Sequence, residues 1–246
     1  VLRGVTPRRL LNALRRHRIS MVIRRAKHDE IQMESGERMV IQPRMTGSLI
    51  VYDRRLKPDE RRYAVLLAAL GEGRWFVYRD VRRLGTISLL DDAAWEAYTA
   101  AIGPEPLTDE FDAGCFSQRL LGTRQAIKKA LMDQSRIAGI GNIYANEALF
   151  RARIDPSQRT DRLTPDDRRR LYRTVRHVLR QARRAGGSTV RDFRDGTGRA
   201  GNYQRVLLVY GRGGLPCRKC RTRLSTTHAI DGRATTFCWR CQGGGS

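Results

Sequence analysis

The sequence predicts an α+β protein with a strand-rich N-terminal part, a helical middle and a β-hairpin zinc finger at its C-terminus. Three observations lead to this prediction. Short β-rich runs separated by turn residues dominate the first hundred residues. Helical patterns follow a double-proline boundary at 103–106. Four of the five cysteines lie in the last thirty residues. With 246 residues, 40% of them hydrophobic, the chain can bury a core without disulfides.

The N-terminal elements are one helix and several strands. Thr6 fits the N-cap and Pro7 the first position of a helix that we expect over 6–15. Four segments predict strands: the two ends of 38–52, then 63–70, then 74–78. A Gly-Glu-Gly turn separates the last two segments, so we expect them to form a hairpin.

Three helices are expected after the proline boundary: 124–133, 142–151 and the segment that begins at Pro165. A glycine turn at 138–141 separates the first two. The third is the clearest, because Thr164 can cap it and apolar residues recur at helical spacing until the glycines at 186–187. A glycine-rich basic loop over 195–203 and the segment 206–210 then lead to the cysteines.

The charge of the chain points to a polyanionic partner. The net charge is +23 and the pI about 11.1, which favours nucleic acid first and an anionic membrane surface second. Only five of the 48 basic residues are lysine, and a GC-rich genome would explain that ratio but not the net charge. No apolar run approaches the ~20 residues of a membrane span, and residues 1–18 show no signal-peptide core, so we expect neither a membrane protein nor a secreted one.

The C-terminal cysteines have the spacing of a structural zinc site. They are Cys217, Cys220, Cys238 and Cys241, in the pattern C-x2-C, 17 residues, C-x2-C. Two disulfides or two redox pairs are the alternatives, and the missing export signal and thioredoxin-like context argue against both. Cys115 stands alone, and we expect it to be a buried apolar residue.

The glycine turn before the second helix is a candidate phosphate site. Glycines allow close approach of the backbone, the free N–H groups at a helix start bind anions, and Asn142 can add its amide. A tight turn between two helices is the alternative. The run 151–200 contains 15 Arg against 6 Asp, and this positive charge favours the phosphate-site interpretation of the turn. Scattered arginines more often indicate a solvated helix face.

Several motifs together resemble the formamidopyrimidine-DNA glycosylase family (Fpg/Nei). They are Arg24-Arg25-Ala26-Lys27, Met45-Thr46-Gly47, Arg82-Arg83-Leu84-Gly85, the Gly103–Leu107 linker, the turn and helix over 127–147, and the four-cysteine finger. The resemblance covers the chain from about residue 20 onward. It implies an incomplete antiparallel β-sandwich over 1–103, a helix–two-turn–helix domain over 104–211 and a zinc finger over 212–246.

The resemblance also implies a function in base-excision repair. Such proteins flip a damaged base out of duplex DNA, cut its glycosidic bond and nick the strand by β,δ-elimination. The implied substrates are oxidised purines, formamidopyrimidine and 8-oxoguanine, and AP sites. The implied protein is a monomer in the bacterial cytoplasm, associated with the nucleoid, that holds one structural Zn²⁺.

The family's roles carry over to individual positions. Lys27 and Arg233 match the strand lysine and the finger arginine that act near the lesion phosphates. Met45 and Arg82 match the wedge that fills the gap left by the flipped base, and Leu84 replaces the phenylalanine of many relatives. Arg124 and Lys128 match cations that contact phosphate. Asn142 and Tyr144 match the phosphate clamp of the helix–two-turn–helix motif and its neighbour. Arg199 lies in the loop that covers an everted purine. Ordinary surface or core roles are the alternative for each of these residues.

One departure concerns the nucleophile. The family uses an N-terminal proline followed by glutamate, whereas this chain begins Val1-Leu2-Arg3-Gly4. Three explanations of this departure stay open. The sequence is a fragment or has a wrongly assigned start, or the protein is a natural truncation that binds lesions without cutting them. In the third explanation another amine, such as Lys27, replaces the proline. The polar run His28-Asp29-Glu30 is also unexpected in a strand. A protein that binds lesions without turnover is therefore one competing interpretation. The charge and the finger alone suggest another, a zinc-containing RNA-binding protein.

Overall fold

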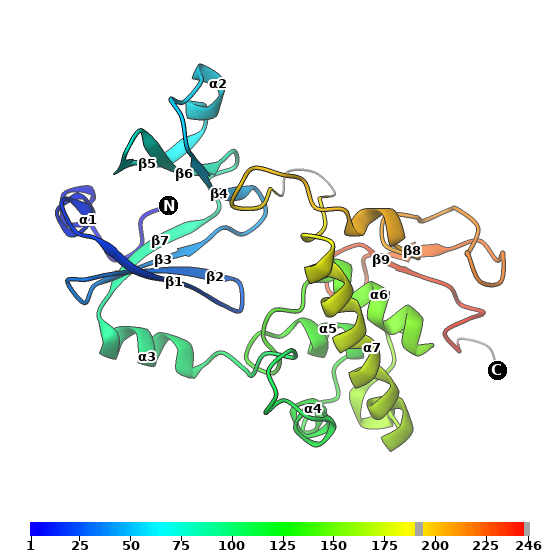
Figure 1. The fold of residues 1–246 in the computed structure, drawn as a ribbon. Helices are drawn as coiled ribbons and strands as arrows, with labels where there is room; N and C mark the ends of the chain where they lie inside the picture. Colours follow the sequence, from blue (N-terminus) through cyan, green and yellow to red (C-terminus); the bar gives the residue numbers. More distant parts are fainter. Residues whose placement is uncertain (190–193, 244–246) are drawn as a thin grey trace. The chain divides into compact units, whose positions relative to one another are not determined.

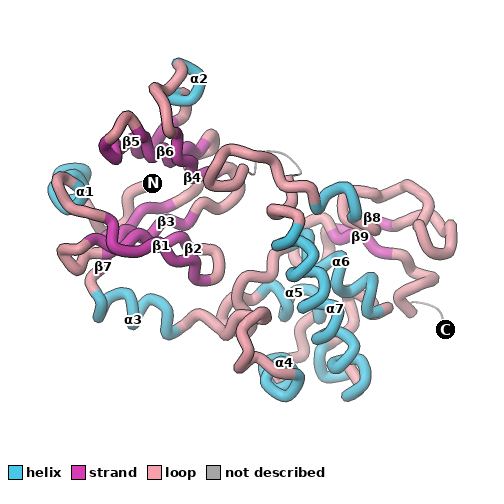
Figure 2. Tube along the Cα trace, viewed as in Figure 1, coloured by secondary structure: helices cyan, strands magenta, loops and turns pink. Residues whose placement is uncertain are grey.

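The computed structural model describes residues 1–189 and 194–243, which form two compact units. The first unit combines Val1–Ala101 with Ala185–Gln204, and the second combines Ile102–Arg184 with Arg205–Ser246. Figure 2 shows the strands of both larger sheets in the first unit and the long helices in the second. The sequence predicts three consecutive domains, whereas here the finger groups with the helices and the segment after residue 184 returns to the first unit.

Two antiparallel sheets build the first unit (Figure 1). The four-stranded sheet has the order β1-β2-β3-β7, from β1 (Ile19–Arg25), β2 (His28–Met33), β3 (Arg38–Gln42) and β7 (Thr86–Leu90). The three-stranded sheet has the order β4-β6-β5, from β4 (Gly47–Tyr52), β5 (Ala64–Gly71) and β6 (Arg74–Asp80). The expected β5–β6 hairpin forms, and Gly71 and Gly73 have the positive φ values that its turn requires.

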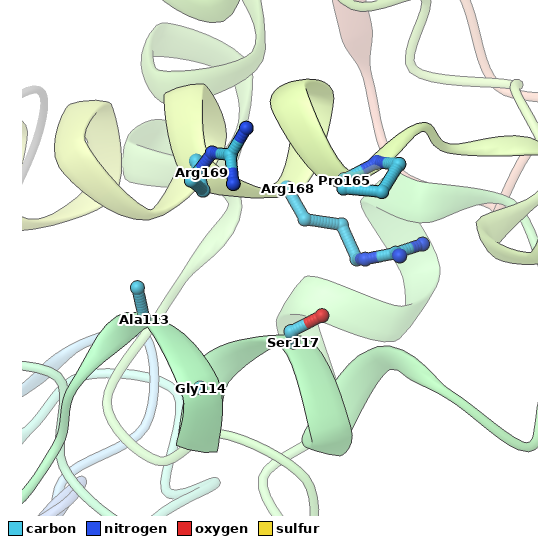
Figure 3. A pocket seen from close by; sticks show the side chains of 6 residues that line it. All are labelled: Ala113, Gly114, Ser117, Pro165, Arg168 and Arg169. Atoms are coloured by element: carbon cyan, nitrogen blue, oxygen red, sulfur yellow. The ribbon is translucent and has the colours of Figure 1, made fainter.

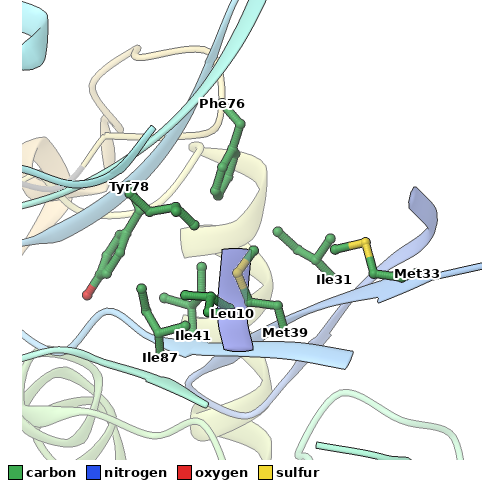
Figure 4. Close-up of a cluster of buried hydrophobic side chains, with 9 residues drawn as sticks. Leu10, Ile31, Met33, Met39, Ile41, Phe76, Tyr78 and Ile87 are labelled. Atoms are coloured by element: carbon green, nitrogen blue, oxygen red, sulfur yellow. The ribbon is translucent and has the colours of Figure 1, made fainter. Parts of the chain in front are cut away.

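Apolar side chains from both sheets fill one core (Figure 4). The core side chains are Ile31, Met33, Met39, Ile41 and Ile87 from the first sheet, Leu66, Phe76 and Tyr78 from the second, and Leu10 from α1 (Pro7–Leu14). The expected cap of α1 is present, since the Thr6 hydroxyl accepts a hydrogen bond from Arg9 N at 3.2 Å. Two sheets around one core confirm the antiparallel sandwich.

The polar run in β2 finds its partners inside the unit. His28 Nε2 lies 2.9 Å from the Tyr98 hydroxyl of α3 (Asp92–Ala100), and burial lowers the pKa of His28. Glu30 is 1% exposed and pairs with Arg38 of β3. These contacts satisfy polar groups that would otherwise be costly to bury. Lys27 lies in the turn between β1 and β2, directly before β2 begins.

The second unit contains four α-helices in its described part: α4 (Ala113–Leu120), α5 (Ile127–Met132), α6 (Asn142–Ala152) and α7 (Pro165–Arg184). The helix expected over 124–133 begins three residues late. The preceding backbone pairs instead with an extended segment, because Ile127 N donates to Gln158 O at 2.8 Å and Thr160 N donates to Gln125 O at 3.0 Å. The helices α3 and α4, the short α2 (Pro58–Arg61) and the strands β1 and β7 are not among the predicted elements.

The longest helix, α7, shows the expected amphipathic pattern. Thr164 caps it, because its hydroxyl accepts from Asp167 N at 3.1 Å. Its buried residues are Leu171, Val175, Val178 and Ala182. Its exposed positions carry much of the basic run, including Arg169, Arg173 and Arg180. Among the described residues, no helix is long and apolar enough to cross a membrane.

The finger hairpin consists of β8 (Ser225–Thr227) and β9 (Thr235–Phe237). It packs on α6 through a small core of Phe150, Val209 and Leu224 together with two of the cysteines. The segment 206–210, which leads into the finger, forms no strand; a 3-10 helix covers Tyr203–Val206. Packing against α6 explains why the finger belongs to the helical unit.

Candidate nucleic-acid interface

Two exposed loops of the first unit carry the residues assigned to a wedge. Met45 lies in the turn between β3 and β4 and is 66% exposed. Arg82 and Leu84 lie in the loop between β6 and β7, where Leu84 is 43% exposed. Arg82 Nη1 approaches Met45 Sδ at 3.7 Å, so the two loops are neighbours. Exposed apolar and cationic groups at adjacent loop tips are suited to insertion between DNA bases.

The loop that carries Arg199 also belongs to the first unit. The Asp195 carboxylate accepts from Thr197 Oγ1 and from Arg199 N, both at 2.8 Å, and the hydrogen bond from Thr197 lowers the pKa of Asp195. Val51 N of β4 donates to Gly196 O at 3.0 Å, which ties this loop to the sheet edge. The Arg199 side chain is exposed. Residues 190–193, which precede this loop, lie outside the described part.

The glycine turn between α5 and α6 is built as its sequence predicts. Gly139 has φ +84, a left-handed conformation that favours glycine. Gln134 holds the turn, because its Oε1 accepts from Gly139 N at 2.9 Å and its Nε2 donates to Ile140 O at 3.1 Å. Helix α6 begins directly after the turn at Asn142, and Tyr144 lies half-buried on its first turn.

Two asparagines of α6 connect this helix to the finger. Asn142 Nδ2 donates to Ala234 O at 3.0 Å. Asn146, which is 1% exposed, accepts from Thr236 N at 2.7 Å and donates to the backbone oxygen of Asn142 at 2.7 Å. The phosphate-clamp candidate Asn142 is therefore fixed by the finger as well as by its own helix.

Glu147 makes a second attachment between α6 and the finger. The sequence interpretation missed this residue. Its carboxylate is fully buried and accepts from the backbone N–H groups of Leu208, Val209 and Tyr210 at 2.9–3.0 Å. Charged hydrogen bonds of this kind hold the chain that enters the finger. The sequence did contain a signal for this role, namely a single glutamate among the apolar residues of α6. A charge on the buried face of a helix needs buried partners.

Lys128 is engaged inside the protein. It is 0% exposed, and its Nζ donates to Asp231 Oδ1 at 3.0 Å and to Thr235 Oγ1 at 2.8 Å. Burial lowers the pKa of Lys128, and the Asp231 carboxylate opposes that shift. A buried ammonium with these partners does not meet a phosphate here, in contrast to the sequence interpretation. Instead it joins α5 to the finger loop.

Replacing Lys128 with methionine should destabilise the second unit. The Asp231 side chain is only 6% exposed, so its charge would stay buried without a partner, at about 3 kcal/mol of unfolding free energy. Urea unfolding measures this loss. Lys129→Met is the matched control, because Lys129 is the adjacent, exposed lysine of α5. Equal losses in the two variants would contradict the positioning role of Lys128.

Arg233 lies exposed on the finger beside a hollow of about 350 Å³. Gln125, Lys129, Met132, Asp133 and Asp231 complete its lining. The Arg233 backbone is fixed, since its N donates to Asp231 Oδ1 at 3.1 Å. Arg124 is also accessible, since its side chain is 83% exposed and its Nε lies 3.7 Å from Asp161 Oδ2. These cations can meet an anion that enters from solvent.

A smaller hollow, of about 250 Å³, lies between the first turns of α4 and α7 (Figure 3). Arg168 and Arg169 line it on the α7 side. Both helix starts are already capped, by Asp112, which accepts from Cys115 N at 2.7 Å, and by Thr164. We therefore assign this hollow no role in binding.

The four finger cysteines form a cluster that could hold a metal ion. All four sulfurs lie within 4.8 Å of one another. The Sγ–Sγ distance is 4.0 Å for Cys217 and Cys241 and 3.4 Å for Cys220 and Cys238. Lys219 N points at Cys217 Sγ at 3.4 Å, and the Thr222 hydroxyl lowers the pKa of Cys220 to about 6. Cys115, expected to be buried, is half-buried on α4 and lies outside the cluster.

Comparisons with known families match both units. Residues 1–87 match the family described as "Formamidopyrimidine-DNA glycosylase N-terminal domain". Residues 102–194 match "Formamidopyrimidine-DNA glycosylase H2TH domain". The formamidopyrimidine-DNA glycosylase of Thermomicrobium roseum is 43% identical, over 93% of this chain and 83% of that protein. The same-named protein of Heliobacterium modesticaldum is 41% identical, over 94% of this chain and 84% of that protein.

Solved structures agree with these sequence matches. The crystal structure of the MutM (Fpg) protein from Thermus thermophilus aligns with a TM-score of 0.83 and 37% identity, over 94% of this chain and 85% of that chain. The Lactococcus lactis Fpg, in complex with DNA that contains an abasic site, aligns with a TM-score of 0.85 and 30% identity, over 96% of this chain and 86% of that chain. The similarity therefore spans both units.

Proposed function

The chain belongs to the formamidopyrimidine-DNA glycosylase family, and from this premise we propose that it is a base-excision repair glycosylase that removes oxidised purines from duplex DNA. The observation that carries the proposal is the attachment of the finger to α5 and α6. Buried contacts of Lys128, Asn146 and Glu147 hold the finger, and Arg233 is left exposed on it. A rigid scaffold that presents one arginine is suited to a fixed phosphate contact.

Recognition of the lesion needs both affinity for phosphate and extrusion of the damaged base. With a net charge of +23, affinity comes mainly from phosphate neutralisation and falls as salt rises. Extrusion costs a few kcal/mol, least for a damaged or weakly paired base. Met45, Arg82 and Leu84 then fill the gap, where Leu84 supplies apolar contact without the stacking of an aromatic ring.

The remaining site residues have narrower roles in this proposal. Lys27 in the β1–β2 turn and Arg233 on the finger act at the phosphates next to the lesion. The contacts to flanking phosphates come from Arg124, Asn142 and Tyr144. The Arg199 loop covers the extruded purine. Lys128 acts through Asp231 and Thr235, as a residue that positions the finger.

The metal in the finger is one structural Zn²⁺ in this proposal. Zinc–thiolate bonds of about 2.3 Å place the sulfurs of a tetrahedral site about 3.8 Å apart, which the observed 3.4 and 4.0 Å bracket. Four thiolates leave no open position, so the metal stabilises the finger and takes no part in the reaction. The protein acts as a monomer in the bacterial cytoplasm, at the nucleoid.

Strand nicking by β,δ-elimination is the second half of the proposed activity. It requires an amine that attacks C1′ of the sugar and forms a Schiff base. Borohydride reduces that Schiff base to a stable bond, so we expect a covalent adduct between the protein and a duplex with an AP site or 8-oxoguanine. Peptide mapping of the adduct identifies the amine, with Val1 and Lys27 as the candidates in this sequence.

An intact duplex is the control for the trapping experiment and should give no adduct. If no adduct forms with the AP-site duplex while the chain still binds it in preference to intact DNA, these 246 residues hold no amine that does the chemistry. Restoring a segment led by Pro-Glu then separates the two explanations: recovery of the adduct identifies a fragment, and its continued absence contradicts the lyase proposal and favours a protein that binds lesions without turnover.

A further inference from the structure

We propose that Thr46 and Asp80 form a latch that holds the two wedge loops together, so that Met45, Arg82 and Leu84 enter DNA as one unit. The inference rests on the proposed function and adds two positioning residues to it. Neither residue touches the lesion in our account. Each contacts both loops, and both are buried, with Thr46 9% and Asp80 0% exposed.

The first loop is a tight turn over 43–47. Gly47 N donates to Pro43 O at 3.0 Å and closes the turn, while Arg44 within it has φ +54. A Cβ at Gly47 would lie 2.4 Å from Pro43 O, so no other residue fits there without a shift of the backbone. Met45 is therefore presented by a turn that has little freedom to deform.

The second loop is closed by Asp80, the last residue of β6. Its Oδ2 accepts from Gly85 N at 2.7 Å, and its backbone oxygen accepts from Arg83 N at 3.3 Å. Gly85 also has no space for a side chain, because a Cβ there would lie 1.9 Å from the Tyr78 hydroxyl and 2.8 Å from Gln42 O. Asp80 thus fixes both ends of the segment that carries Arg82 and Leu84.

The Thr46 hydroxyl connects the two loops. It donates to Asp80 Oδ1 and accepts from Arg82 N at 3.1 Å. One hydroxyl therefore contacts the carboxylate that closes the second loop and also the backbone of a wedge residue. A buried network with all its groups satisfied is stiffer than its separate bonds, because each bond polarises the next.

The latch has a consequence for insertion into DNA. Side chains that fill a gap in the base stack lose affinity if they must first be ordered. Loops held in register before binding avoid that loss. Thr46 and Asp80 therefore act on lesion binding and have no effect on affinity for intact duplex, where the wedge does not insert.

The test compares Thr46→Val, which removes the hydroxyl at nearly constant shape, with Thr46→Ser, which keeps it. Thr86→Val is the matched control, since Thr86 lies in the same unit on β7 and its hydroxyl has no hydrogen-bond partner among the described residues. Fluorescence anisotropy measures binding of an intact duplex and of one with a tetrahydrofuran AP-site analogue. A 2-aminopurine opposite the analogue reports insertion of the wedge.

We expect Thr46→Val to lower the preference for the tetrahydrofuran duplex about tenfold and to weaken the 2-aminopurine signal, since the buried carboxylate and N–H lose their shared partner. Thr46→Ser and Thr86→Val should stay within about twofold of the parent. In a Met45→Ala background, Thr46→Val should add less than about twofold, because the latch acts through the wedge. Thr46→Ala serves as the second variant if Thr46→Val does not fold.

An unchanged preference in Thr46→Val, or losses that multiply with those of Met45→Ala, would overturn the latch. An equal loss in Thr46→Ser would also overturn it, because that variant retains the hydroxyl. A parent chain that binds both duplexes equally would overturn the proposed function, and the latch with it.

Discussion

Arg233→Ala should reduce cleavage of an AP-site duplex about a hundredfold, because a charged contact that acts on the transition state has been removed. Affinity for intact duplex should fall by less than about threefold, because one phosphate contact among many is lost. The variant should leave the finger intact, since the backbone of Arg233 is held by Asp231 and its side chain is exposed. Single-turnover cleavage and anisotropy measure the two effects separately.

Arg240→Ala is the matched control for Arg233→Ala. Arg240 is another exposed arginine of the finger, and it lies between the last two cysteines, away from the hollow that Arg233 lines. Arg240→Ala should lower cleavage and duplex binding only slightly, and both to the same extent. Equal losses of cleavage and binding in Arg233→Ala would mean that Arg233 contributes general affinity and has no role at the lesion.

Cys238→Ser should abolish zinc binding and unfold the finger. Cys238 is fully buried and belongs both to the sulfur cluster and to the small core against α6. Structural zinc contributes about 10–16 kcal/mol to the folding of small fingers, so loss of one thiolate is not compensated by the hairpin alone. Duplex binding should weaken about tenfold, because an unfolded finger no longer holds any of its exposed cations in place, Arg233 being only one of them.

Metal analysis and duplex binding check the effect of Cys238→Ser. The matched control is Cys115→Ser, which changes the one cysteine outside the cluster and should leave one zinc per chain. An unchanged zinc content in Cys238→Ser would contradict the assignment of the four-cysteine site.

The helices and strands whose ends are marked by capping or turn residues were predictable from the sequence. Thr6 and Thr164 cap their helices as expected, and the Gly71–Gly73 hairpin forms where its glycines indicate. Helix α5 is shorter than predicted because backbone pairing with 158–160 competes with the helix, and that pairing is a tertiary effect. The return of 185–204 to the first unit is likewise a long-range contact with no local signature.

The residues of the candidate site likewise divide into those whose role the sequence predicts and those whose role depends on long-range contacts. The cysteine spacing and the motifs around Met45, Arg82 and Asn142 identify residues whose chemistry is visible in the sequence. Lys128 shows the limit, because a lysine in a basic chain indicates a phosphate contact until the structure buries it against Asp231, more than a hundred residues away. Glu147 and Asp80 were missed for the same reason, since a buried carboxylate is defined by partners distant in the sequence.

The central claim is that this chain recognises damaged DNA and does not simply bind polyanions through its +23 charge. Competition binding at physiological salt tests this most directly, with an 8-oxoguanine duplex as the labelled probe. We expect unlabelled lesion duplex to compete at a concentration at least about tenfold lower than intact duplex or RNA of equal length. Equal competition by all three would contradict the claim and leave a basic, zinc-containing nucleic-acid-binding protein.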